Sequence, residues 1–123
     1  TGDPRRAVAY RWLVFTAVNT YEAGCRVSHP QYYSDDPANL DGIRRKSLQD
    51  LNDYWSMTEC AIDGGPFFFG RQCSVLDLCL LMVAQWHPGK GELLERLSKL
   101  ATLCKAVRER PSVDGIWHLN FDD

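Results

Sequence analysis

Apolar residues recur every three or four positions through most of the chain, a spacing that predicts helices. The strongest such segment begins at Ser74 and ends at Trp86, and only Asp77 and Gln85 are polar within it after Ser74. A helix that is apolar all round belongs in the centre of a domain. We therefore expect the segment from Val75 onwards to form a central helix with no side facing water.

The remaining apolar pattern predicts further helices on both sides of this segment. One is expected over residues 3–24, where Gly24 would end it, and a long one over 40–62 with Trp55 as its core anchor. Residues 25–38 are broken by prolines and predict a surface connection. After the central helix we expect an amphipathic helix over 93–107 and an apolar tail, 113–121, that packs back. No segment has the two-residue period of a strand.

The residues at the start of the central helix predict a structural capping box. Ser74 is placed to accept a hydrogen bond from the backbone three residues on, and the Asp77 carboxylate can reach back to the Ser74 N–H. This role accounts for a buried Asp77 more simply than acid–base catalysis does. The predicted fold class is therefore all-α, a bundle of five or six helices around a central buried helix.

Length and charge narrow the possible functions. The 123 residues, 45% of them apolar, suffice for one domain with one core, and a net charge of −2 gives no argument for nucleic acid or an anionic membrane as partner. The longest apolar run, Leu78 to Ala84, is far below the ~20 residues that span a bilayer. With no signal-peptide pattern at Thr1, we expect a cytoplasmic domain without nucleic-acid or membrane partners.

Metal-ligating and nucleophilic residues are scattered along the chain. His29, His87 and His118 each lack a second ligand three or four positions away, so no metal site is expected. The number of cysteines is odd and none forms a Cys-x-x-Cys pair, which favours reduced, mostly buried thiols. Cys25, which precedes Arg26, and Cys73, beside a helix start, are candidate nucleophiles, but a structural role is the better interpretation of both. No catalytic residue is predicted.

Three motifs together indicate a family. Phe67-Phe68-Phe69-Gly70 before the Ser74 box, Asp3-Pro4-Arg5-Arg6 near the start, and Arg108-Glu109-Arg110-Pro111 near the end all match its pattern. The chain resembles, over residues 4–121, the all-helical C-terminal domain of bacterial-type cytosolic glutathione transferases. Leu76, where that family prefers alanine, is a local departure.

The resemblance implies a function shared between two domains. In this family a thioredoxin-like N-terminal domain binds glutathione and supplies the activating Tyr, Ser or Cys, and none of its elements occurs in residues 1–123. The chain would then be the substrate-site and dimerisation domain of an enzyme that adds glutathione thiolate to hydrophobic electrophiles. Alone, we expect it to be inactive and to bind no glutathione tightly. The positions that match the electrophile site are Arg11, Val14, Val18, Tyr21, Glu22 and Trp86.

Two other functions fit the same fold. One is a non-catalytic protein-interaction domain, which would need no thiol-activating segment. The other is a stand-alone bundle that binds a ligand on its exposed helix face. The sequence names neither the electrophile nor the oligomeric state.

Overall fold

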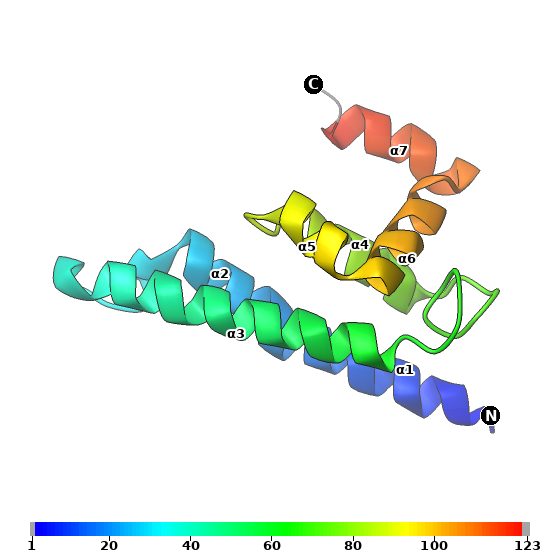
Figure 1. Cartoon of the computed structure of the whole chain (residues 1–123), viewed down its shortest axis with the longest axis horizontal. Coiled ribbons are helices and arrows are strands. Elements are labelled where there is room, and N and C mark those ends of the chain that lie inside the picture. The colour runs from blue at the N-terminus through cyan, green and yellow to red at the C-terminus, as the bar shows by residue number, and fades with distance from the viewer. Residues whose placement is uncertain (1, 122–123) are drawn as a thin grey trace.

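The computed structural model describes residues 2–121, and helices make up most of them. The first helical rod consists of α1 (Pro4–Phe15), a π-helical segment η1 (Thr16–Tyr21) and α2 (Glu22–Ser28). Two short 3₁₀ turns, η2 (Pro30–Tyr32) and η3 (Pro37–Asn39), lead into the long α3 (Leu40–Ala61). The helix α3 runs back antiparallel to the first rod (Figure 1).

Gly24 does not end the first helix, which corrects the boundary expected from the sequence. The rod continues through α2 and ends only at His29, just before Pro30. A glycine inside a helix costs only about 1 kcal/mol relative to alanine, and burial of Ala23 and Val27 against α3 offsets that cost. Pro30 is the real stop because the residue before a proline disfavours helical backbone.

The second half of the chain forms a layer on top of this pair (Figure 1). It contains α4 (Val75–Gln85), α5 (Lys90–Arg96), α6 (Ser98–Arg108) and α7 (Pro111–Phe121). The single helix expected over 93–107 is divided at Leu97, whose backbone leaves the helical region. The terminal helix packs back only in part, because Ile116 and Leu119 remain exposed.

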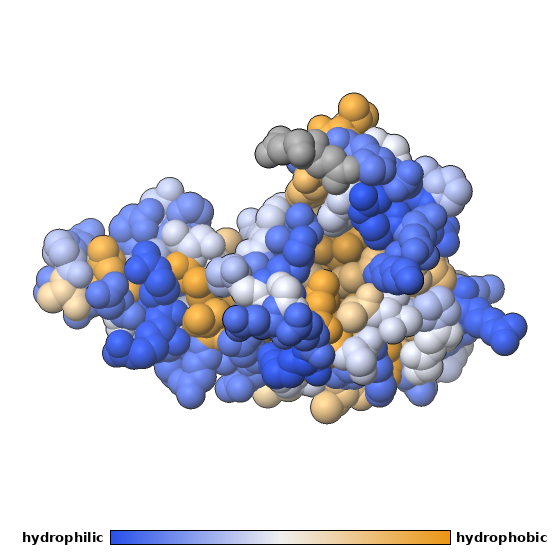
Figure 2. All heavy atoms as spheres, turned by 45° about the horizontal axis from the view of Figure 1, so that its top comes forward, coloured by the Kyte–Doolittle hydropathy of each residue, from blue (hydrophilic) through white to orange (hydrophobic). Residues whose placement is uncertain are grey.

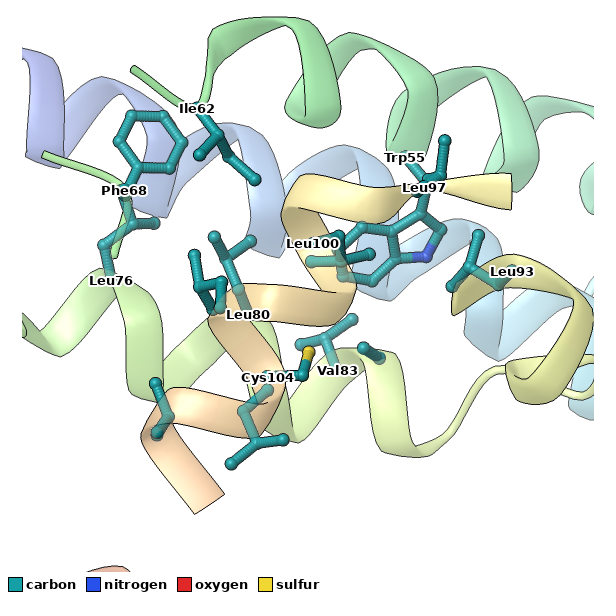
Figure 3. Close-up of a cluster of buried hydrophobic side chains, with 14 of the residues drawn as sticks. Trp55, Ile62, Phe68, Leu76, Leu80, Val83, Leu93, Leu97, Leu100 and Cys104 are labelled. Carbon is teal, nitrogen blue, oxygen red and sulfur yellow. The ribbon is translucent and has the colours of Figure 1, made fainter. Parts of the chain in front are cut away.

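The core lies between the two layers and is centred on α4. Trp55 extends from α3 into the space between Leu93, Leu100 and Val83 (Figure 3), and its side chain is fully buried. Its expected role as core anchor is confirmed. The other fully buried large apolar side chains are Phe68, Ile62, Leu76, Leu80, Leu100, Leu103 and Val107.

The all-α fold class is confirmed, but α4 is not enclosed on every side. It packs mainly against α6, α1 and η1. Val75 is 63% exposed, Leu78 42% and Met82 43%, so one stripe of this helix faces solvent. The expectation that no side of α4 meets water is therefore wrong. Val75 and Leu78 line an open hollow beside Ile116 and Trp117 of α7, and the helices of residues 2–121 leave the stripe partly exposed. No helix in the described part of the chain is long and apolar enough to cross a membrane.

Candidate functional site

Asp77 holds the segment before α4 in place through its carboxylate. Its Oδ2 accepts hydrogen bonds from the Ser74 N–H at 2.7 Å and the Ser74 hydroxyl at 2.8 Å. Its Oδ1 accepts the backbone N–H of Phe68 at 2.7 Å. Asp77 is fully buried, so the carboxylate is used structurally. The bond to Phe68 joins the loop after α3 to the start of α4.

A hollow lined largely by apolar and uncharged side chains lies between η1–α2, α3 and the end of α4. It has a volume of about 380 Å³, within the range of small-molecule sites. Its lining residues are Thr20, Tyr21, Gly24, Cys25, Ser28, His29, Leu51, Trp55, Val83, Trp86 and His87. We call this hollow the α2–α4 pocket. None of these side chains is Asp, Glu, Lys or Arg.

Tyr21 and Trp86 are the two sequence-predicted site residues that the structure brings together in this pocket. Their ring centroids are 6.0 Å apart with the planes tilted, and about half of each side chain is exposed. Interaction with the neighbouring Cys25 thiol raises the pKa of Tyr21 above its ordinary value of 10. Tyr21 is therefore a neutral hydroxyl beside the pocket and not a phenolate.

The other predicted residues lie outside the pocket. Val14 and Val18 are about 60% exposed on the first rod, and Arg11 is also exposed. Glu22 is paired with Arg26 at 2.9 Å, and Arg26 lies 3.7 Å from Asp50 of α3. That ion-pair network ties α2 to α3, so the carboxylate of Glu22 already has a cationic partner.

An apolar stripe runs from the pocket along each of two neighbouring helices. Val14, Val18 and Tyr21 follow at helical spacing on the first rod, while Val75, Leu78, Met82 and Trp86 do so on α4. The helix α4 contacts both α1 and η1, and the two stripes meet where Tyr21 approaches Trp86. We call the combined surface the outer face.

A second exposed apolar area lies near the C-terminal helix. Apolar residues gather in the hollow between that helix and the rest of the bundle (Figure 2). A depression of about 320 Å³ there has Leu81, Leu94 and Trp117 in its lining. Lys90, Lys105 and Arg108 also line it, so it is less suited to an apolar ligand than the α2–α4 pocket.

His87 lines the α2–α4 pocket as a neutral imidazole. Its Nδ1 accepts the Gly89 N–H at 3.0 Å, which leaves Nε2 to donate to Asn52 Oδ1 at 3.1 Å. Burial lowers the pKa of His87 below its ordinary value of 6.5, and the positive charge of Arg96 lowers it further, against the opposing effect of the Gly89 bond. Protonation at Nδ1 would remove that bond.

This arrangement predicts acid sensitivity. Because the pKa of His87 is lower in the folded than in the unfolded state, the unfolded chain binds more protons below pH 6.5. The contribution of His87 to stability is fully present above that pH and is lost as the pH falls toward the folded-state pKa. We expect the free energy of unfolding, measured in denaturant melts at a series of pH values below 6.5, to fall less steeply with decreasing pH in His87→Gln than in the parent. His29→Gln, at an exposed histidine, is the control; equal slopes for parent and His87→Gln would contradict the assignment.

Three of the cysteines have thiols that are less acidic than a free cysteine, which makes them poor nucleophiles. Burial raises the pKa of Cys73, and the nearby charge of Asp77 raises it further. Burial also raises the pKa of Cys79, and that of Cys104 to about 12. All five thiols are free. Over residues 2–121, no three His, Cys, Asp or Glu side chains are grouped so that they could hold a metal ion.

Most pocket residues were missed from the sequence for two identifiable reasons. Ending the first helix at Gly24 assigned Cys25, Ser28 and His29 to a loop, although they follow Tyr21 at helical spacing. Continuing the helical period to Pro30 would have found them. Trp55 was assigned to the core alone, and nothing local indicated that it also reaches the pocket.

The sequence also matches a known family. Residues 25–115 match the family described as glutathione S-transferase, C-terminal domain. The chain belongs to this family. The match covers both α3 and α4 and most of the pocket lining, so the resemblance suggested by the motifs is confirmed at the level of the family.

A curated relative extends the match toward the N-terminus. The chain is 18% identical over 119 residues to an uncharacterised GST-like protein, YncG, of Escherichia coli (strain K12). The alignment covers 97% of this chain and 57% of that protein, so the chain spans little more than half the relative's length. No solved structure matches the chain.

Proposed function

We propose that the chain supplies the electrophile-binding half of a glutathione S-transferase. The observation that carries this proposal is the α2–α4 pocket, whose lining includes the half-exposed rings of Tyr21 and Trp86, two residues of the outer face. Aromatic rings with one exposed side provide large contact areas for apolar molecules. The reaction would add glutathione thiolate to a hydrophobic electrophile held against these rings.

Within the proposal, the predicted residues divide into two groups. Tyr21 and Trp86 contact the electrophile, whereas Val14 and Val18 extend the apolar surface away from the pocket. Arg11 and Glu22 are polar residues at the edge of the site. Because Glu22 is paired with Arg26, we propose that it orients α2 and does not bind glutathione directly.

A thioredoxin-like domain is the partner that we propose for the outer face. It would bring the glutathione site and the residue that activates the thiol, neither of which we assign to this chain. Two features support this partner: membership of a C-terminal domain family, and a relative that is longer than the chain. Homodimer formation and a cytoplasmic location are parts of the same proposal.

The test is turnover by the full-length product of the gene with glutathione and a chlorodinitrobenzene, beside the 123-residue chain. We expect turnover by the gene product and none by the chain. Trp86→Ala and Tyr21→Ala should each lower kcat/KM about tenfold, the equivalent of losing about 1.4 kcal/mol of aromatic contact. Tyr10→Ala is the matched control, because Tyr10 is a similarly exposed tyrosine of the first rod outside the pocket.

Two outcomes would overturn parts of the proposal. If both pocket variants stay within about twofold of the parent, the electrophile does not bind there. If the full-length product itself shows no turnover, the non-catalytic interaction domain becomes the better assignment, and the outer face would then be its docking surface.

A further inference from the structure

The depression of about 320 Å³ beside α7 combines an apolar lining with positive charge of one sign. Its charged side chains are Lys90, Lys105 and Arg108, and among the residues that the structure describes no carboxylate lines it. The rest of its lining is apolar apart from Gln85. We call this depression the α6–α7 hollow. An apolar surface bordered only by cations favours a ligand that is both apolar and anionic.

Two of these three cations already have carboxylate partners. Arg108 lies 2.7 Å from Asp114 of α7, and Lys105 lies 3.9 Å from Glu109 at the end of α6. These carboxylates offset the positive charge that α6 contributes to the hollow. The charge that remains without a carboxylate partner is therefore that of Lys90, the first residue of α5.

Lys90 is only partly exposed, and its contacts hold its ammonium group at the hollow. Its Nζ donates to the Oε1 of Gln85 at 2.7 Å, and both residues line the hollow. Within residues 2–121 it makes no ion pair, and an amide oxygen supplies no counter-charge. Burial raises the pKa of the Cys104 thiol, and the ammonium is close enough to oppose that rise. A half-buried cation without a counter-charge is a favourable partner for an anion from outside.

The hollow also has accessible apolar surface for the rest of such a ligand. Leu94, Ala101 and Trp117 line it, and each is partly exposed. The Arg108 guanidinium lies over the Trp117 ring, 4.9 Å from its centroid, which helps to hold that ring in place. A volume of about 320 Å³ is at the lower end of the range for small-molecule sites.

We propose that the α6–α7 hollow binds small apolar carboxylates, with Lys90 as the residue that recognises the carboxylate group. The hydrocarbon part lies against Leu94, Ala101 and Trp117. The α2–α4 pocket has no Asp, Glu, Lys or Arg in its lining, so the two hollows select ligands of different charge. This site lies outside the proposed electrophile site and does not depend on it.

Titration of the 123-residue chain, followed by proton–nitrogen NMR, tests the ligand class without glutathione or turnover. The indole N–H resonances of Trp117 and Trp86 report the α6–α7 hollow and the α2–α4 pocket separately. The probes are naphthoate, naphthalenemethanol, which has the rings without the charge, and acetate, which has the charge without the rings. At Trp117 we expect naphthoate to bind about three- to tenfold more tightly than naphthalenemethanol, the gain from one partly exposed charge contact. Acetate should cause no saturable shift, and added sodium chloride should reduce the preference for naphthoate.

Substitutions at two lysines separate recognition by Lys90 from a general effect of charge. Lys90→Gln should lower the affinity for naphthoate to about that for naphthalenemethanol, while Lys90→Arg should retain the preference. Lys99→Gln is the matched control, because the Nζ of Lys99 also donates to a neutral oxygen, the Ile62 carbonyl at 3.2 Å, but Lys99 does not line the hollow. It should leave the preference unchanged.

The outcomes distinguish this inference from the proposed function. Equal affinities for naphthoate and naphthalenemethanol at Trp117, or a preference that survives Lys90→Gln unchanged, overturn the assignment of Lys90 even if the full-length product is an active transferase. Naphthoate that shifts the Trp86 resonance and leaves that of Trp117 unmoved overturns the location of the site. A preference reported by Trp117 and lost in Lys90→Gln supports the inference, and it does so whether or not turnover is found.

Discussion

Asp77→Ala should lower the free energy of unfolding by about 3 to 5 kcal/mol, which is among the larger effects of a single substitution. The carboxylate accepts three hydrogen bonds, two from Ser74 and one from the Phe68 N–H. Loss of the helix cap costs about 1 kcal/mol, and each buried donor left without an acceptor adds about 1 to 3 kcal/mol. Phe68 is 1% exposed, so water cannot replace the lost acceptor.

Denaturant melts followed by circular dichroism measure this cost. The free energy of unfolding of Asp77→Asn should lie between those of the parent and Asp77→Ala. The amide keeps one acceptor oxygen, which cannot accept hydrogen bonds from both Ser74 and the Phe68 N–H. Asp53→Ala is the control at an exposed aspartate of α3, and it should stay within about 0.5 kcal/mol of the parent. A similarly small effect for Asp77→Ala would show that the carboxylate does not hold the loop and the helix together.

The elements that the sequence predicted well are those whose signals are local. The long α3 has a sustained apolar period from Leu40 onwards, and the α4 segment begins at the serine expected. Both signals depend on residues within a few turns of one another. The family resemblance also rested on short local motifs, and the family match confirms it.

The break at Leu97 depends on contacts that are distant in sequence. The start of α6 is capped by Glu59, whose carboxylate accepts the N–H groups of Lys99 at 2.9 Å and Leu100 at 2.8 Å. Glu59 lies in α3, about forty positions earlier. The apolar period continues through Leu97, so the pattern alone favoured one helix where the structure has two.

The candidate site was predictable only where the family motifs pointed to it. Tyr21 and Trp86 came from matching helices, and the structure places both at the pocket. Thr20 and Trp55 also line the pocket, but their sequence positions look like those of ordinary core residues. The open stripe of α4 was missed for a related reason. An apolar helix side looks the same in sequence whether it faces its own bundle or another domain.

Leu80→Ala and Leu78→Ala provide the sharpest test of that open stripe. Leu80 is fully buried, whereas Leu78, two positions earlier in the same helix, is 42% exposed. Truncating a buried leucine costs about 2 to 5 kcal/mol, because contacts are lost and a cavity remains. We expect that cost for Leu80→Ala in the 123-residue chain, and less than about 1 kcal/mol for Leu78→Ala.

The unfolding free energies of Leu80→Ala and Leu78→Ala, measured again in the full-length product of the gene, test whether the proposed partner domain covers this stripe. If a thioredoxin-like domain covers the outer face, the side chain of Leu78 becomes buried there, and Leu78→Ala should cost about 1 to 3 kcal/mol more than in the chain alone. Leu80→Ala should cost the same in both, because its surroundings lie within the bundle. An unchanged cost for Leu78→Ala would mean that the partner domain does not dock on this stripe of α4.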